Sequence, residues 1–170
     1  DNDSEEEAIA FYSADNESRI HALFMECQKD NYTVVKDIVF DASNIDRIDF
    51  CDINSDGAYE VLIGYSSSTS SVNILNVYTF SKKVKQLGSS YTYSSFVTGD
   101  LNGDKNDDIL LLSLFSGDIS AQAKLVVHNY NDGLSEIGVT DLDPDITQFA
   151  SVIYGQLCSG SYGVVIDGVS

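Results

Sequence analysis

The chain is short of basic residues, cysteine, histidine, proline and tryptophan. Its 170 residues include 9 Lys and Arg against 27 Asp and Glu, a formal net charge of −18. So large a negative charge repels nucleic acid and anionic lipid surfaces, and we expect neither as a partner. No apolar run is long enough to span a bilayer, so we expect no direct membrane insertion by this segment. A hydrophobic content of 43% still excludes wholesale disorder and allows one domain with a sizeable core.

Three cysteines and two histidines leave few groups for nucleophilic or redox chemistry. An odd number of cysteines leaves at least one free thiol, and no pair of them has metal-ligand spacing. His21 and His128 are isolated in apolar, strand-like stretches, where a packed or rim position is the expected role. No Ser-His-Asp or Cys-His arrangement and no Gly-rich phosphate loop is apparent, so we expect that the protein is not an enzyme.

Short side chains that carry oxygen are abundant, and they form two similar runs. The runs are Asp52–Glu60 (DINSDGAYE) and Asp100–Asp108 (DLNGDKNDD), each with an oxygen side chain at positions one, three, five and nine. Such side chains at alternate positions can turn inward on a tight loop, with a backbone carbonyl added at position seven. An all-oxygen cage of this kind suits Ca²⁺. The same residue types also favour metal-free turns, which is the alternative interpretation.

The residues after each run exclude an EF-hand, which ends with Glu at position twelve and continues as a helix. Position twelve is Ile63 in the first run and Leu111 in the second. The stretch beyond each loop is short, apolar and largely branched, which predicts a buried strand. The second loop differs from the first in having Lys105 where the first has Gly57, at a position that often requires positive φ.

The sequence between the loops repeats with a period of about 50 residues. Four strands per period are the pattern of propeller blades, and we expect no helix. The only proline, Pro144, lies in a linker and interrupts no strand. The expected strands are Ala8–Tyr12, Ile20–Cys27, Tyr32–Phe40, Ile45–Cys51, Val61–Tyr65, Val72–Phe80, Val84–Leu87, Tyr93–Gly99, Ile109–Phe115, Ala123–Tyr130, Leu134–Ile137 and Thr147–Gly155.

The repeats are placed at residues 1–44, 45–92, 93–145 and 146–170 of a single β-propeller-like region, 1–170, with the first and last incomplete. Asp1, Asp3 and Glu7 match part of a further loop at the start. In a fourth copy of the loop near the end, Gln156, Cys158, Gly160 and Val164 replace the ligands, so we expect no metal there. The fold class is therefore all-β, with about three four-stranded blades. We expect an open fragment of a larger propeller that self-associates through its end blades.

The two loops, each framed by strands, resemble FG-GAP/VCBS repeats, which build integrin-α-type β-propellers. The runs NVYTF and DLNGDKNDDILLL are similar to clostridial secreted lipoproteins with VCBS-like repeats. The resemblance implies Ca²⁺ as the cofactor. It also implies two sets of ligands. The first loop supplies Asp52, Asn54, Asp56 and Glu60 with the Ala58 carbonyl, and the second supplies Asp100, Asn102, Asp104 and Asp108 with the Asn106 carbonyl.

The expected function is a non-enzymatic, Ca²⁺-stabilised propeller module for protein or glycan recognition. The resemblance places it outside the cell, on a bacterial surface, with lipid anchoring through a segment upstream of Asp1. By the same analogy a partner binds on the face that carries the Ser-rich tips Ser13–Ser18, Ser66–Ser71 and Ser116–Ser120. The alternatives are a degenerate carbohydrate-active propeller enzyme and an architectural spacer. The tips lack Trp, Tyr and Phe up to Phe115, which counts against glycan binding.

Overall fold

The computed structural model of the protein describes residues 6–29, 31–69, 72–80, 83–114, 121–129 and 133–170. Within these ranges the regular elements are thirteen β-strands, and no helix is present. Accordingly, the described residues contain no helix that is long and apolar enough to cross a membrane. The expectation of an all-β fold without helices is confirmed.

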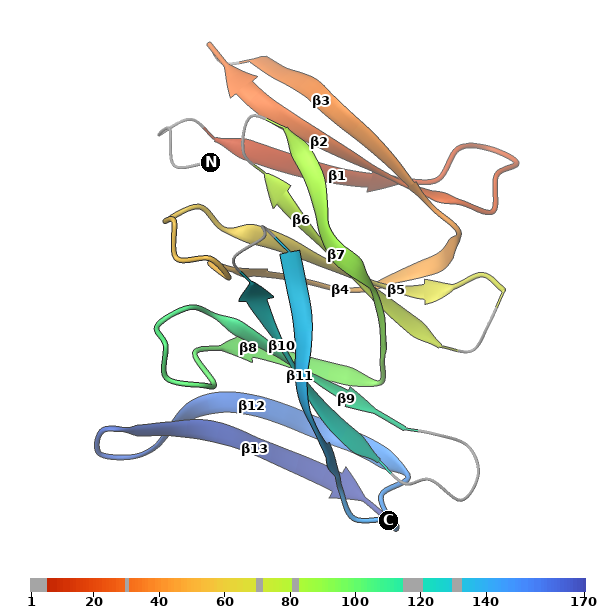
Figure 1. Cartoon of the computed structure of the whole chain (residues 1–170). Coiled ribbons are helices and arrows are strands. Elements are labelled where there is room, and N and C mark those ends of the chain that lie inside the picture. Colours follow the sequence, from red (N-terminus) through yellow and green to blue (C-terminus); the bar gives the residue numbers. More distant parts are fainter. Residues whose placement is uncertain (1–5, 30, 70–71, 81–82, 115–120, 130–132) are drawn as a thin grey trace. The chain divides into compact units, whose positions relative to one another are not determined.

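The strands form four antiparallel sheets in which neighbours follow chain order (Figure 1). The first sheet has three strands, β1 (Glu7–Tyr12), β2 (Ile20–Gln28) and β3 (Asn31–Phe40). The second has four, β4 (Ala42–Cys51), β5 (Glu60–Ser67), β6 (Asn73–Phe80) and β7 (Val84–Tyr93). The third has four, β8 (Ser95–Gly99), β9 (Asp108–Ser113), β10 (Gln122–Asn129) and β11 (Gly133–Asp141). The fourth pairs β12 (Gln148–Cys158) with β13 (Ser161–Val169).

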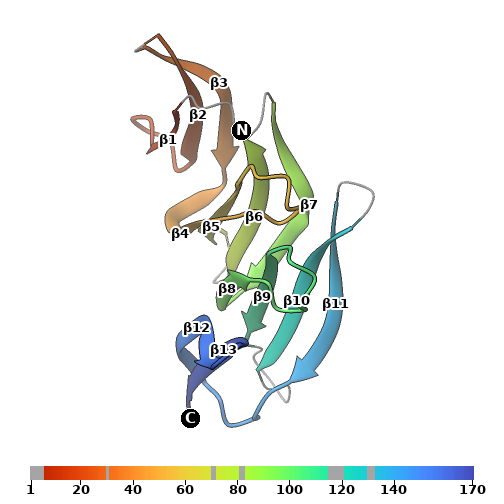
Figure 2. The same cartoon turned by 90° about the vertical axis from the view of Figure 1, so that its left-hand side faces the viewer.

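The sequence pattern predicts sets of three, four and four strands with one or two more at the end, and the observed series of three, four, four and two is consistent with propeller blades. Figure 2 shows the chain-order arrangement of β8, β9, β10 and β11 within their sheet. The chain divides into two compact units. Unit 1 is Asp1–Asp52 with Asp56–Tyr91, and unit 2 is Ile53–Ser55 with Thr92–Ser170.

Aromatic side chains hold the two sheets of unit 1 together. Phe24 of β2 is fully buried, and its ring lies 5.1 Å from that of Phe80 in an edge-to-face contact. The ring centroid of Phe40, at the end of β3, lies 4.9 Å from that of Tyr65 of β5 and 6.3 Å from that of Tyr78 of β6. These ring pairs join β2 and β3 of one sheet to β5 and β6 of the other, and edge-to-face pairs add stabilisation beyond the area they bury.

In unit 2 the core includes residues of β8, at one edge of the four-stranded sheet, and of its neighbour β9. Phe96 of β8 and Leu111 and Leu112 of β9 are almost fully buried. Tyr154 of β12 packs directly over Gly99 at the end of β8, and its hydroxyl donates a hydrogen bond of 3.0 Å to the Asp100 carbonyl. The two-stranded sheet is thereby fixed to the start of the Asp100–Asp108 loop.

Three local expectations are wrong. Strand β7 runs on to Tyr93, well past the predicted end at Leu87. Only Asp41 separates β3 from β4, where a linker of four residues was expected. The fourth copy of the loop does not form, because β12 and β13 pair closely from Cys158 opposite Ser161 and the turn between them contains Gly160 at φ 78°. This stretch lacks the Asp and Asn residues that favour the turns of the two loops predicted to bind Ca²⁺. The two strands therefore pair directly through a tight turn.

None of the three cysteines forms a disulfide: Cys51 is buried, Cys27 is half-buried and Cys158 is exposed. An odd number of cysteines leaves at least one outside an intrachain disulfide, as expected. Cys51 ends β4 opposite Glu60, and Gly99 ends β8 opposite Asp108, so a small residue occupies the same place before each loop.

Candidate metal centre

Two loops of the same length carry the predicted ligands. Loop A (Asp52–Glu60) connects β4 to β5, and loop B (Asp100–Asp108) connects β8 to β9. In both loops position nine is the first residue of the following strand and is buried: Glu60 is 2% exposed and Asp108 is 1% exposed. The sheet therefore fixes the last carboxylate of each loop.

The two loops share backbone conformation as well as sequence. Positive φ occurs at position four in both, with Ser55 at 54° and Gly103 at 83°, and at position six in both, with Gly57 at 85° and Lys105 at 76°. In both loops the N–H of position seven donates to the carboxylate of position five at 2.8 Å. Lys105 therefore adopts the left-handed conformation that its counterpart glycine adopts, and the replacement does not change the loop.

In loop B the predicted side chains come together. The Asn102 amide nitrogen donates to Asp104 Oδ2 at 3.1 Å and to Asp108 Oδ1 at 3.3 Å. Asn102 Oδ1 accepts from the Asp104 N–H at 2.8 Å, and Asp100 Oδ1 accepts from the Gly103 N–H at 2.8 Å. Side chains at positions three, five and nine are thus joined through one amide.

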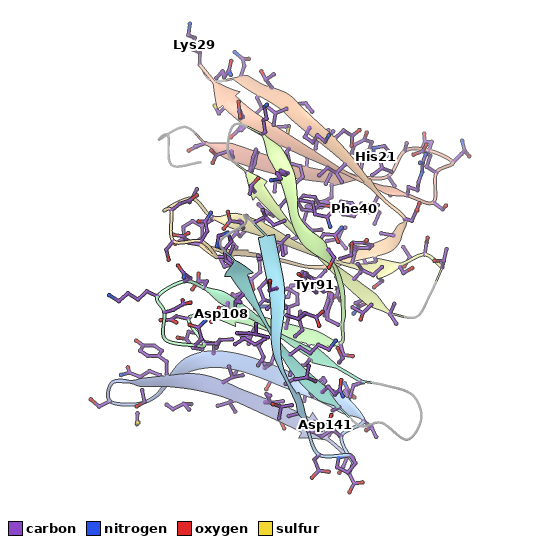
Figure 3. All side chains as sticks on the ribbon, viewed as in Figure 1. His21, Lys29, Phe40, Tyr91, Asp108 and Asp141 are labelled. Carbon is purple, nitrogen blue, oxygen red and sulfur yellow. The ribbon has the colours of Figure 1, made fainter. Side chains whose placement is uncertain are left out.

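Asp108, labelled in Figure 3, is the buried carboxylate of loop B. Burial, together with the smaller effect of the Asp104 and Asp100 charges, raises the pKa of its carboxyl to about 6. The N–H groups of Leu101 and Asn102, which donate to Asp108 Oδ2 at 3.0 and 3.1 Å, oppose this shift of the pKa.

Loop A repeats part of this arrangement. Asp52 accepts from the Asp56 N–H at 3.1 Å and from the Gly57 N–H at 3.0 Å. Asp52 and Asp56 belong to unit 1 with Glu60, while Asn54 belongs to the short segment assigned to unit 2. The side chain of the next residue, Ser55, donates to the Lys105 carbonyl at 2.8 Å, which is a contact inside unit 2.

The residues fit Ca²⁺ by the chemistry of their donors, because each loop offers carboxylate and amide oxygens that a hard cation prefers. Among the described residues, no three His, Cys, Asp or Glu side chains are gathered closely enough to hold a metal ion. The carboxylates at positions one and five of each loop accept hydrogen bonds from backbone N–H groups of the same loop.

The loop predicted from Asp1, Asp3 and Glu7 is only partly within the described residues. Asp1 and Asp3 lie outside them, whereas Glu7 is the first residue of β1. That set of ligands stays a prediction.

Comparison with known proteins gives one family match. The model of the FG-GAP-like repeat matches residues 52–111, which begin at the first position of loop A and end within β9. Residues 52–111 are an FG-GAP-like repeat. The chain matches no curated protein and no solved structure. The resemblance drawn from the two loops is confirmed, and the FG-GAP-like segment contains both of them.

Position six of the FG-GAP-like loops allows a matched test of backbone strain. A side chain in the left-handed region costs about 1 kcal/mol, which glycine avoids. We expect Lys105→Gly to raise the free energy of unfolding by about 1 kcal/mol, and Gly57→Ala to lower it by a similar amount. Urea denaturation measures both. If Lys105→Gly destabilises the chain, φ at this position is negative in solution.

Sequence reasoning missed a charged cluster around His21, labelled in Figure 3. His21 Nε2 lies 3.0 Å from Glu17 Oε2, and Nδ1 lies 3.1 Å from Asp37 Oδ2. The imidazole stacks on Tyr12 at 4.7 Å, and Arg19 pairs with Glu17 at 2.9 Å. The hydrogen bonds to Glu17 and then Asp37 raise the pKa of His21 above its usual 6.5. Only strand pairing reveals the Asp37 partner, so spacing in the sequence gives no signal for it.

This cluster predicts a pH dependence of stability. The pKa of His21 is higher in the folded chain, so its contribution is fully present below about pH 6.5 and is lost as pH rises through the folded pKa. We expect the urea midpoint of the wild type to decrease as the pH is raised above neutral, and to decrease more than the midpoint of His21→Asn does. If the urea midpoints of the two proteins change with pH in the same way, His21 has the same pKa in the folded and the unfolded chain.

Proposed function

We propose that this chain is a non-enzymatic, Ca²⁺-stabilised recognition module that works outside the cell and binds a protein or glycan. The observation that carries the proposal is the pair of loops with the same backbone conformation, each ending in a buried carboxylate. Oxygen donors arranged twice in this way favour a hard divalent cation over a soft one.

In loop B the ion would be held by Asp100, Asn102, Asp104 and Asp108 with the Asn106 carbonyl. When bound, Ca²⁺ supplies positive charge and cross-links the loop. The protein side chains fix where this charge lies, because Asp108 is held in β9 and by two backbone N–H donors. In loop A the corresponding ligands are Asp52, Asn54, Asp56 and Glu60 with the Ala58 carbonyl.

The chemistry of the loops supports a structural role for the ion rather than catalysis. A loop whose own side chains supply the coordination sphere leaves little room for substrate. Ca²⁺ is also a weaker source of bound hydroxide than zinc. His21, the best placed candidate for acid–base chemistry, has both ring nitrogens beside carboxylates. These features support recognition as the activity.

The proposed setting rests on ion supply and charge. Ca²⁺ loops of simple composition are filled most readily at the millimolar concentrations found outside cells. The net charge of −18 disfavours nucleic acid and anionic lipid as partners. A bacterial surface with a lipid anchor is the setting that the resemblance to secreted lipoproteins favours. Of the tips proposed to meet the partner, residues 13–18 and 66–69 are described, while 70–71 and 116–120 lie outside the described residues.

The test is a binding screen of the immobilised chain against a glycan array and a panel of extracellular matrix proteins. We expect saturable binding to at least one protein or glycan in Ca²⁺, and loss of that binding in EDTA. Asp104→Ala should weaken the same interaction, and Gln156→Ala, on β12, serves as the control. Binding that is equal with and without Ca²⁺, or turnover of a bound glycan, would contradict the proposal.

A further inference from the structure

Unit 1 contains a cavity that the proposed function does not use. Its volume is about 610 Å³, and residues of β1, β4, β5, β6 and loop A line it. Pockets that bind small molecules in proteins occupy roughly 300–1,000 Å³ and are lined mostly by apolar and aromatic groups with few polar ones. The size and lining of this cavity meet that description.

Four aromatic rings from four different segments surround the space. Phe11 comes from β1, Phe50 from β4, Tyr59 from loop A and Phe80 from β6. Phe80 is buried, while Phe50 is 54% exposed and Tyr59 is 63% exposed. Large apolar side chains left in solvent around one hollow are a feature of interaction sites. The lining of the cavity is therefore rich in aromatic side chains.

The charge of the cavity is negative. Among its described lining residues, Glu7 is the one with a charged side chain. Glu7 lies directly opposite Glu26 in the pairing of β1 with β2, and opposite residues in an antiparallel pair project from the same face of the sheet. Glu7 thus brings a carboxylate to the lining, and Glu26 is its neighbour across the strand pair, in a chain whose net charge is −18. An anionic ligand would be repelled, and a cation would be attracted.

We propose that this cavity binds an organic cation with an aromatic or branched apolar body, such as a quaternary ammonium compound. Aromatic faces attract a cation within about 6 Å of the ring centre, and the attraction grows as the site is desolvated. The apolar walls accommodate the body of the ligand, while Glu7 supplies the opposing charge. The site goes beyond the proposed function, because it requires neither the metal nor the macromolecular partner.

The test is a calorimetric titration of the intact chain with benzyltrimethylammonium in Ca²⁺ buffer. Benzyl alcohol serves as the neutral comparison and benzoate as the anionic one. We expect the ammonium compound to bind about tenfold more tightly than benzyl alcohol, with no binding of benzoate. Phe50→Ala should weaken the ammonium compound about tenfold, and Glu7→Gln should weaken it several-fold.

Matched controls lie in unit 2. Tyr162 is as exposed as Tyr59, at 63%, and Glu136 is an exposed carboxylate on β11. Tyr162→Ala and Glu136→Gln should leave the affinity unchanged. Should Phe50→Ala misfold by circular dichroism, Tyr59→Leu is titrated in its place. No saturable heat up to about 10 mM ligand, equal affinity for benzyl alcohol, or unchanged affinity in the cavity variants would overturn the proposal.

Discussion

Adding Ca²⁺ to the EDTA-treated chain is expected to raise its melting temperature by several degrees for each loop that fills. An ion that binds only the folded state adds about 2.7 kcal/mol per site at a hundredfold excess over the dissociation constant. For a chain of this size that corresponds to about 5–10 °C per site. The physical source is the anionic loop, where burial and neighbouring charges already raise the pKa of Asp108 to about 6.

Single substitutions show how much of the Ca²⁺-dependent rise in melting temperature comes from each loop. Asp104→Ala should remove the site in loop B and Asp56→Ala the site in loop A, each lowering the Ca²⁺ stoichiometry by one in calorimetry. Gln156→Ala lies on β12, outside both loops, and should change neither stoichiometry nor melting. A melting curve that does not move on addition of Ca²⁺, with no heat of binding, would refute the metal hypothesis.

The strands were predictable because their hydrophobic pattern is local. Runs such as Val61–Tyr65 are apolar and branched, and they form central strands buried on both faces. The equivalence of the two loops was also predictable, since the spacing of Asp and Asn determines which backbone N–H groups their side chains can accept. The order of the sheets and the geometry shared by loops A and B were therefore accessible from local patterns.

Other features depend on contacts that spacing does not show. Lys105 adopts positive φ because the loop around it is held by side-chain hydrogen bonds, which override its own preference. Residues after Leu87 continue β7 because Tyr91 and Tyr93, two positions apart on the same face of the strand, are buried in the core. The ion pairs of His21 and the cavity beside Phe50 arise only when several strands are brought together.

The small residue before loop B gives the second large prediction. Gly99 has φ 155°, and a Cβ added there would overlap the ring of Tyr154. Gly99→Ala therefore has to strain the backbone, and it has to displace a ring whose hydroxyl donates to the Asp100 carbonyl at 3.0 Å. Backbone strain and overpacking together predict a loss of about 2–4 kcal/mol in the free energy of unfolding.

Gly155, inside β12, provides a control, because its φ is not positive and nothing lies within 4 Å of an added Cβ. Gly155→Ala should change stability by less than about 0.5 kcal/mol in the same urea titration. If the ring of Tyr154 causes the clash, Tyr154→Ala should recover part of the loss in a double-mutant cycle, since contacting residues do not behave additively. Equal losses in the two glycine variants would instead show that neither the positive φ of Gly99 nor the packing of Tyr154 over it limits stability at the start of loop B.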